Sequence, residues 1–253
     1  MIQSSIMMEG DSQISIVTLN RPTVYNAVTY DVLLALERFV TELENDPPRV
    51  VILTGAKPGF CSGIDLKESR EATSEFARKR ATLMHNVLHR LRNIPSPLIA
   101  AVDGVAAGLG CELAISGDLR IASPSSRFSY PEPKVAVPSP TFHLSRLIGM
   151  ARTQDVLLTA RWIDAGEALD WGLITRSAGD PLAAATELAG ELLALSPISL
   201  AKTKENLAIS ISGGEVPAMH HHIQHVAAAA GTRDRIEALT AFAEKRQPRF
   251  EGR

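Results

Sequence analysis

Apolar residues recur along the chain with two different periods, and these periods divide it into two regions. Short apolar runs favour strands at 14–19, 50–54, 98–102, 119–122 and 173–176. Apolar stripes at helical spacing predict helices at about 31–43, 71–92, 141–148, 152–160 and 165–171, with Asp31 as the cap of the first. From 181 onward the pattern is wholly helical, through 181–195, 197–210, 216–230 and 232–246. This order predicts an α/β core, residues 1–195, followed by a helical region, residues 196–253.

Composition narrows the classes of function. The chain has 253 residues, of which 45% are hydrophobic, so it can bury a sizeable core. A formal net charge of −2 gives no electrostatic basis for binding nucleic acid or an acidic membrane, and no run of 18 apolar residues occurs. The first 13 residues lack the features of a secretory signal. The two cysteines, Cys61 and Cys111, form no CxxC pair, which indicates a reduced, cytoplasmic setting.

The segment 97–138 carries the most chemical information. A buried strand leads into a glycine-rich turn at Gly108, and Glu112 follows at a helix start among apolar neighbours. Burial there raises a glutamate pKa toward the range useful for proton transfer, although favourable placement at a helix N-terminus alone also accounts for such a residue. A second carboxylate, Glu132, stands between Pro131 and Pro133, which we expect to exclude a helix and hold the chain extended.

Two glycine turns are positioned to expose backbone N–H groups. Gly63 follows a predicted strand and allows a tight turn at a helix start, which would direct the N–H of Ile64 outward. The turn at 107–110 offers the N–H of Leu109 in the same way. Two such donors aimed at one point form an oxyanion hole, where losing one donor typically costs roughly 2.7–4 kcal/mol. Taken alone, each turn also fits an ordinary connection between a strand and a helix.

Taken together, these features resemble the enoyl-CoA hydratases of the crotonase superfamily over nearly the whole chain. Six motifs occur in the family's order: LNRPTVYNAV at 19–28, FCSGIDLKE at 60–68, IAAVDGVAAGLGCELAISGDLRIAS at 99–123, FSYPEPKVAVP at 128–138, ALDWGLITR at 168–176 and AFAEKRQPRF at 241–250. The resemblance implies an α/β crotonase (ClpP-like) fold. This is a spiral of ββα units with C-terminal helices that build trimers, commonly paired into hexamers.

The resemblance also implies the residue roles. An acyl-CoA thioester would bind with its carbonyl oxygen between the N–H groups of Ile64 and Leu109. Glu112 and Glu132 would be the catalytic acid–base pair of a hydratase that uses no metal or redox cofactor. Glu112 would act chiefly on the water, and Glu132 would handle the Cα proton. The residues implied in binding substrate and coenzyme A are Val24, Ala27, Phe60, Ser62, Gly63, Asp65, Leu66, Gly108, Pro131 and Lys245, the last approaching from the C-terminal helix.

Two departures from the family pattern bear on the substrate. Relatives commonly have Gly or Ala where this chain has Leu109, whose isobutyl group must point away or narrow the acyl pocket. A glycine-rich loop of the family is replaced by VPSPTFH at 137–143. There His143 is either an additional polar pocket residue or, as we favour, a surface residue at a helix start.

Other readings of the sequence are weaker. A Δ3-Δ2-enoyl-CoA isomerase or a specialised acyl-CoA dehydratase would use the same fold. A nucleotide-dependent oxidoreductase is disfavoured because Leu113 stands at the third glycine position of GxGxxG. A scaffold or RNA-binding role is the non-enzymatic alternative, and the charge balance argues against RNA binding. His85 with His89, or the run 220–222 with His225, lacks an HExxH glutamate or a nearby cysteine, so we expect no metal.

Overall fold

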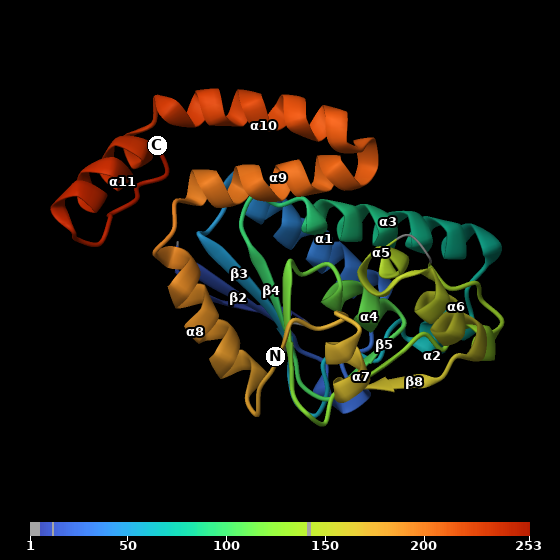
Figure 1. Cartoon of the computed structure of the whole chain (residues 1–253). Helices are drawn as coiled ribbons and strands as arrows, with labels where there is room; N and C mark the ends of the chain where they lie inside the picture. Colours follow the sequence, from blue (N-terminus) through green and yellow to red (C-terminus); the bar gives the residue numbers. More distant parts are fainter. Residues whose placement is uncertain (1–5, 12, 141–142) are drawn as a thin grey trace.

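A six-stranded sheet forms the centre of the protein (Figure 1). The computed structural model describes residues 6–11, 13–140 and 143–253. The strand order is β1 (Ile6–Gly10), β2 (Ile14–Leu19), β3 (Val50–Gly55), β4 (Leu98–Val102), β6 (Leu119–Ala122) and β9 (Arg176–Ser177). Within this sheet, as far as the described residues go, β1 and β2 pair antiparallel and the other neighbours pair in parallel. The apolar residues of β3 and β4 are buried along both strands, which is typical of parallel strands covered on both faces.

Helices cover the two faces of this sheet. On one face lie α1 (Tyr30–Asn45) and α3 (Ser74–Arg92), whose Leu36 and Leu91 belong to the same buried cluster as Leu53. On the other face α8 (Pro181–Leu193) packs Leu188 into a second cluster with Ile52. Figure 1 shows α8 and α3 on opposite sides of β3 and β4. The alternation of residues along the strands therefore supplies both layers of the core.

A smaller sheet and several short helices complete the core. The second sheet contains β5 (Val105–Ala107), β7 (Arg127–Ser129) and β8 (Trp162–Asp164), in that order. The short helices are η1 (Pro22–Val24), α2 (Leu66–Arg70), α4 (Leu109–Ala114), η2 (Glu132–Val135), α5 (Leu144–Ile148), α6 (Met150–Thr159) and α7 (Ala165–Asp170). Across the described ranges, no helix combines the length and apolar character that a membrane crossing requires.

The α/β class and most of the long elements are confirmed, and several boundaries are wrong. The helix expected at 71–92 begins three residues later, as α3, because the Thr73 side chain caps it by accepting from the N–H of Phe76. Thr29, not Asp31, caps α1. The strand expected at 173–176 is reduced to β9. Of the helix expected at about 141–148, residues 141–142 lie outside the described residues, and α5 begins at Leu144.

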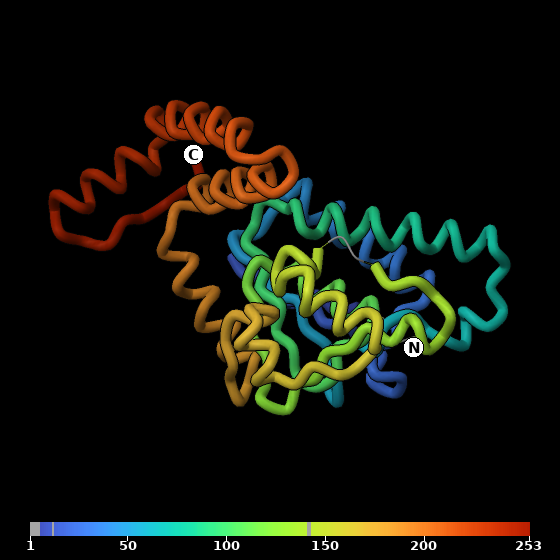
Figure 2. Tube along the Cα trace, turned by 45° about the vertical axis from the view of Figure 1, so that its right-hand side comes forward, coloured from blue at the N-terminus to red at the C-terminus, as the bar shows by residue number. Residues whose placement is uncertain are grey.

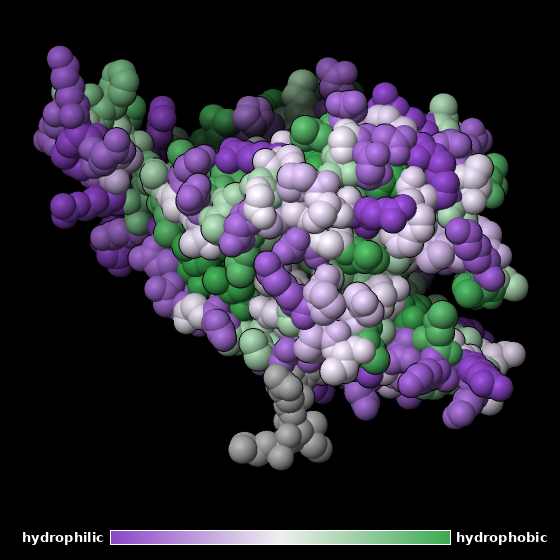
Figure 3. All heavy atoms as spheres, turned by 90° about the horizontal axis from the view of Figure 1, so that it is seen from below, coloured by the Kyte–Doolittle hydropathy of each residue, from purple (hydrophilic) through white to green (hydrophobic). Residues whose placement is uncertain are grey.

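Three helices follow α8, of which the first lies against the core, with Lys204 donating to Asp118 at 2.7 Å, and the other two stand apart from it (Figures 1 and 2). The three are α9 (Pro197–Gly213), α10 (Glu215–Ala230) and α11 (Arg233–Glu244). Buried Asp234 ties α11 to the chain end by accepting from the N–H groups of Glu251 and Gly252, and Ser196 donates to it at 2.9 Å. By contrast, α9 and α10 bury no residue. On the core face seen from below in Figure 3, hydrophilic and hydrophobic side chains are mixed.

The side chain of Asn26 holds the loop after β3 against the loop after β2. Asn26 is 2% exposed and has a left-handed backbone, with a φ of 57°. Its Nδ2 donates to the carbonyl oxygens of Ala56, Gly59 and Phe60 at 2.8, 2.7 and 3.1 Å. Its Oδ1 accepts from the N–H of Arg21 at 2.8 Å. One amide therefore fixes the approach to residues 61–64.

Replacing this amide with a carboxylate should destabilise the fold. In Asn26→Asp, a second oxygen would face three carbonyl oxygens that have lost their donor, while aspartate still tolerates the left-handed backbone. We expect the free energy of unfolding to fall by at least about 2 kcal/mol, measured by urea unfolding followed through tryptophan fluorescence. The exposed Asn86→Asp is the matched control and should change it little. Equal stability of the two variants would contradict this role for Asn26.

Candidate active site

Residues 61–64 are held between two other backbone segments by hydrogen bonds and two isolated bridges. The N–H of Cys61 donates to the carbonyl of Val105, and the N–H of Ala107 donates back to Cys61, both at 2.9 Å. On the opposite side, the N–H of Val28 donates to Gly63 at 2.8 Å. Parallel bridges accordingly join Cys61 to Ala106 and Val28 to Ile64. The backbone at Ile64 is thus fixed from both sides.

The two expected donor segments lie against each other. Gly63 has a φ of 97°, and a Cβ built on it would lie 2.7 Å from the carbonyl oxygen of Ala107 and 3.5 Å from the nitrogen of Leu109. Only glycine permits this approach. Among the described residues, neither the N–H of Ile64 nor that of Leu109 has a hydrogen-bond acceptor, as the first turn of α4 requires for Leu109. Two neighbouring backbone donors are therefore available to one acceptor.

The Leu109 side chain is directed into the core. It is 5% exposed and belongs to the main buried cluster. Its N–H stays available because α4 begins at this residue, after Gly108 with a φ of 52°. Of the two expectations for Leu109, the structure therefore shows that its isobutyl group points away from the turn, into the core.

Glu112 lies in the first turn of α4 and is almost fully enclosed. It is 4% exposed, and the hydroxyl of Tyr130 donates to its Oε1 at 3.2 Å. Burial raises the pKa of Glu112 to about 7, against the lowering effects of Arg92 and of the Tyr130 hydroxyl, and the charge of Glu132 adds to the rise. The carboxyl group therefore exchanges its proton near neutral pH.

Glu132 is the first residue of the 3-10 helix η2. Its Oε1 lies 2.9 Å from a Cβ built on Gly108, and Ser139 donates to its Oε2 at 3.4 Å. Burial is the main reason that its pKa is raised. The extended conformation expected from Pro131 and Pro133 is wrong. The segment forms η2, because both prolines occupy positions before or in the first turn, where no N–H is needed.

These groups form one arrangement suited to acid–base chemistry. Gly108 links them, since the carboxylate of Glu132 lies over it and the N–H of Leu109 follows it. Glu112 is one turn further along α4 and senses the charge of Glu132. Two carboxyl groups with raised pKa values beside two N–H donors can move a proton each way while negative charge builds on a bound oxygen.

Sequence reasoning missed the groups that support the two glutamates. Tyr130 is fully buried and immediately follows β7, so its place two residues before Glu132 was the available signal. Arg92, at the end of α3, gave no signal because only the tertiary fold brings its charge to Glu112. Ser139 lies in the loop that departs from the family pattern.

The residues implied in coenzyme A binding fall into three groups. Val24, Ser62 and Asp65 lie together, because Ser62 donates to the carbonyl of Val24 and the adjoining Arg21 pairs with Asp65 at 3.1 Å. Burial raises the pKa of Asp65, but hydrogen bonds from Arg21 and the backbone outweigh it and leave that pKa lowered. Leu66 is 61% exposed beside this group.

The second group is enclosed. Gly63 and Gly108 form the donor turns, Pro131 packs within 3.9 Å of the Cβ position of Gly108, and Ala27 is 8% exposed. Phe60 has no exposed surface and belongs to the core, so it supports the wall of the site and does not itself offer a contact.

Lys245 forms the third group alone. It is the C-cap of α11, which Figure 1 shows well apart from α4. Within one chain, therefore, Lys245 does not join the two glutamates.

His143 is the N-cap of α5, so its place at a helix start is as expected, but its side chain is half-buried and not the surface residue that we favoured. Its pKa is lowered to about 4, chiefly by burial and also by the positive charges of Arg92, Arg146 and Arg120. A neutral imidazole thus lies on the side of the fold that carries Arg92 and Glu112. The adjoining Thr141 and Phe142 lie outside the described residues, and a pocket role for His143 stays a prediction.

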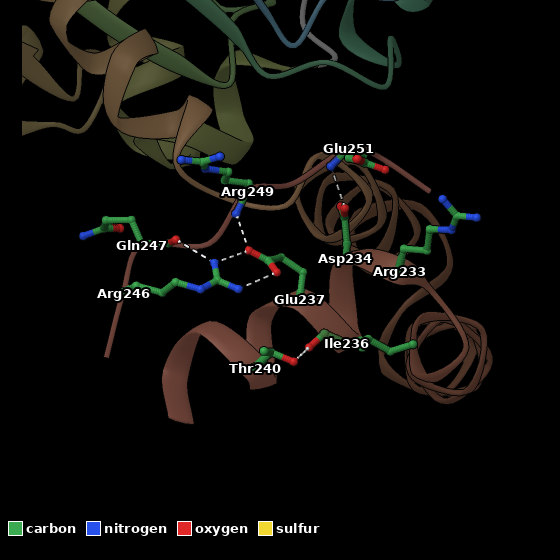
Figure 4. A pocket seen from close by; sticks show the side chains of 9 residues that line it. All are labelled: Arg233, Asp234, Ile236, Glu237, Thr240, Arg246, Gln247, Arg249 and Glu251. Atoms are coloured by element: carbon green, nitrogen blue, oxygen red, sulfur yellow. Dashed lines mark hydrogen bonds and ion pairs between the residues drawn. The ribbon is translucent and has the colours of Figure 1, made fainter. Parts of the chain in front are cut away.

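A cavity of about 860 Å³ lies elsewhere, on α11 and the chain end (Figure 4). The Glu237 carboxylate that lines it already has partners. Arg246 forms two bonds to Glu237, at 2.6 and 2.9 Å, and the N–H of Arg249 donates to the same carboxylate at 2.8 Å. Neither Glu112 nor Glu132 lines this cavity, and no residue of the two donor turns does.

The raised pKa of Glu112 predicts a pH-dependent stability change in Glu112→Gln. The unfolded carboxyl group ionises near 4.5 and the folded one near 7, so wild-type stability falls as pH rises across this window. Above this pH window, ionised Glu112 lowers the free energy of unfolding by on the order of 3 kcal/mol. Glutamine removes this cost, so its Tm should exceed that of wild type at pH 8 and match it near pH 4. The exposed Glu187→Gln is the control, and a difference independent of pH would contradict burial of an ionisable Glu112.

Known proteins share this sequence and fold. Residues 9–253 match the family model "Enoyl-CoA hydratase/isomerase". A short-chain-enoyl-CoA hydratase of Clostridium acetobutylicum is 34% identical over 252 residues, 96% of each chain. A mitochondrial methylglutaconyl-CoA hydratase of Mus musculus is 32% identical over 255 residues, 96% of this chain and 81% of the mouse protein. The crystal structure of an enoyl-CoA hydratase from Bacillus anthracis superposes with a TM-score of 0.95 at 30% identity, covering 99% of this chain and 100% of that one. The expected crotonase fold is thereby confirmed, and the chain belongs to the enoyl-CoA hydratase/isomerase family.

Proposed function

We propose that this protein is an enoyl-CoA hydratase that adds water to a trans-2-enoyl-CoA thioester. The observation that carries the proposal is the placement of Glu112 and Glu132 around Gly108, beside the free N–H groups of Ile64 and Leu109. A hydratase needs one group that accepts a proton from water and one that delivers a proton to carbon. Both are carboxyl groups of raised pKa here.

The reaction follows from this geometry. The thioester oxygen accepts hydrogen bonds from the N–H groups of Ile64 and Leu109. As the water oxygen forms a bond to Cβ, Glu112 takes a proton from it, and the electrons of the C=C bond move toward the thioester oxygen. The two N–H donors stabilise that charge. Glu132 then gives its proton to Cα, which regenerates the carbonyl and completes the addition of H and OH. Glu112 then releases its proton and Glu132 takes one up from solvent, so both H and OH come from water in net terms, and the proposal needs no metal or redox cofactor.

The same acid–base pair bears on the alternative isomerase reaction. Moving a double bond from Cβ–Cγ to Cα–Cβ requires one proton removed and one returned, which a single carboxyl group can perform. A buried second carboxyl group such as Glu112 is unnecessary there and costs stability. We therefore favour hydration. A panel of 2-enoyl and 3-enoyl thioesters, straight and branched, separates hydratase, isomerase and specialised dehydratase by which substrates turn over.

Changing either glutamate to glutamine should remove most of the activity. We expect Glu112→Gln and Glu132→Gln each to lower kcat for hydration of crotonyl-CoA by at least about 10²-fold, with little change in affinity for the thioester, because only proton transfer is lost. Loss of the crotonyl-CoA ultraviolet absorbance gives the rate. Glu187→Gln, on the surface of α8, is the matched control and should keep wild-type activity. Near wild-type kcat in either active-site variant would refute the two-carboxylate mechanism.

The proposal includes assembly into a homotrimer or a hexamer of two trimers. It is supported by large apolar side chains exposed on the C-terminal helices: Leu207, Ile211, Val216, Met219, Ile223, Val226, Ile236, Leu239 and Phe242. Phe242 is 84% exposed in the single chain. A neighbouring subunit that covered this surface would remove it from water, which stabilises the assembly. Such a neighbour is also the remaining way for Lys245 to approach a bound coenzyme A. We place the enzyme in the cytoplasm, where its two free, buried cysteines stay reduced.

Charge placed on this apolar surface should break the assembly. We expect light scattering of wild type to give a multiple of the 27.2 kDa chain mass, and Leu239→Glu with Phe242→Glu to give the mass of one chain, with a raised KM for coenzyme A esters. Leu158→Glu, at a 79% exposed apolar residue of α6, is the control and should leave the mass unchanged. A monomeric wild type with full activity would exclude the assembly.

A further inference from the structure

Two histidines of α10 face the neighbouring helix α9. Partly buried positions on α10 recur at 218, 221, 225 and 229, a spacing of three to four residues that marks one face of a helix. This face turns toward α9, the element against which α10 packs (Figure 1). His221 and His225 are one turn apart on it. Glu205 projects from α9 beside them, and one ligand atom from each of the three side chains lies within 4.8 Å of the other two.

The orientation of His225 is the second observation. Its Nδ1 lies 3.0 Å from Oδ1 of Asn206, and its Nε2 lies 3.6 Å from Oε2 of Glu205. The side chain is 14% exposed, so the ring is held in place. Metal-binding histidines in proteins typically donate one ring nitrogen to an oxygen partner, which leaves the other directed at the metal. Asn206 gives His225 that arrangement, with its free nitrogen directed toward Glu205 and His221.

The charge of this cluster is set by Glu205. A hydrogen bond from Lys202, whose Nζ lies 2.8 Å from Oε2 of Glu205, is the main reason that the pKa of this carboxyl group is lowered. The charges of Lys202, His225 and His221 lower it further. Lys202 is therefore the cation that a metal ion must displace from the Glu205 carboxylate.

We propose that Glu205, His221 and His225 form a binding site for a divalent transition-metal ion of the zinc class. Two imidazole nitrogens and one carboxylate oxygen suit Zn²⁺ or Co²⁺, with water in the fourth position. The ion would join α9 to α10 across the seam between them. The exposed apolar stripe of α10, which includes Val216 and Ile223, lies on the opposite face and stays free.

This site goes beyond the proposed hydration chemistry, to which it contributes no atom. From sequence alone we expected no metal, because the run 220–222 with His225 offered no further ligand type nearby. The fold supplies that ligand from α9. A bound ion would brace two helices that bury no residue of their own.

The test is metal titration of protein expressed without a histidine tag and freed of metal with EDTA. Co²⁺ is added and followed by its visible absorbance, and Zn²⁺ is then used to displace it. We expect one ion per chain. His221→Gln, His225→Gln and Glu205→Gln should each weaken binding at least about 10-fold. Lys202→Gln should tighten it, because it removes the competing cation.

The adjoining His220→Gln and His222→Gln are the matched controls, since both residues belong to the same run but not to the cluster. Neither should change the affinity. Zn²⁺ should also raise the Tm of wild type and of these two controls, and not that of His225→Gln. Absence of stoichiometric binding in wild type would overturn the proposal. Binding that survives His221→Gln and His225→Gln, or is lost equally in His222→Gln, would also overturn it.

Discussion

The site depends on the backbone pairing of residues 61–64 with β5. Two hydrogen bonds at Cys61 connect the loop after β3 to the strand after β4, and these are distant parts of the sequence. The pairing is close enough that a Cβ on Gly110 would lie 2.1 Å from the carbonyl oxygen of Cys61. Glycines at 63, 108 and 110 therefore allow one region of backbone to present two free N–H groups. Without this contact, the two donors would belong to unrelated loops.

The ionisable groups around this backbone lower the stability of the fold at its site. Glu112 is buried where its charge is unfavourable, and one tyrosine hydroxyl with one arginine charge compensates it only in part. Glu132 is less enclosed, and its pKa is also raised. Neither arrangement serves stability, since a glutamine would be accommodated more easily at position 112. A carboxyl group that titrates near pH 7 is what proton transfer to and from water requires.

Sequence and structure agree best where the physical constraint is local. The strand before Gly108 and the helix start at Glu112 are predictable, because a run of apolar residues must be buried and a glycine must turn the chain. The three-residue strands β5 and β7 are not, because they are set by pairing with distant segments and include polar residues such as Arg127. Capping by Thr73 was missed because several polar residues near it were equally suitable.

Long-range proximity was the other limit. The charge of Arg92 reaches Glu112, and Glu205 meets the histidines of α10, only after separate helices have packed against each other. Family resemblance supplied the pairing of Glu112 with Glu132, which spacing along the chain did not. It also supplied Lys245, which the single chain leaves far from α4 (Figure 1).

The central claim is that the N–H groups of Ile64 and Leu109 together polarise a thioester carbonyl. Infrared difference spectroscopy tests it most directly, with an enoyl-CoA whose thioester carbonyl carries carbon-13, bound to Glu132→Gln so that it is not consumed. The carbonyl stretching band should move to lower wavenumber than in free solution, because two hydrogen bonds weaken the C=O bond. Adding Leu109→Pro, which removes one N–H, should reverse much of that shift. A thioester that binds to the Glu132→Gln protein with its carbonyl band unshifted from free solution would contradict the claim.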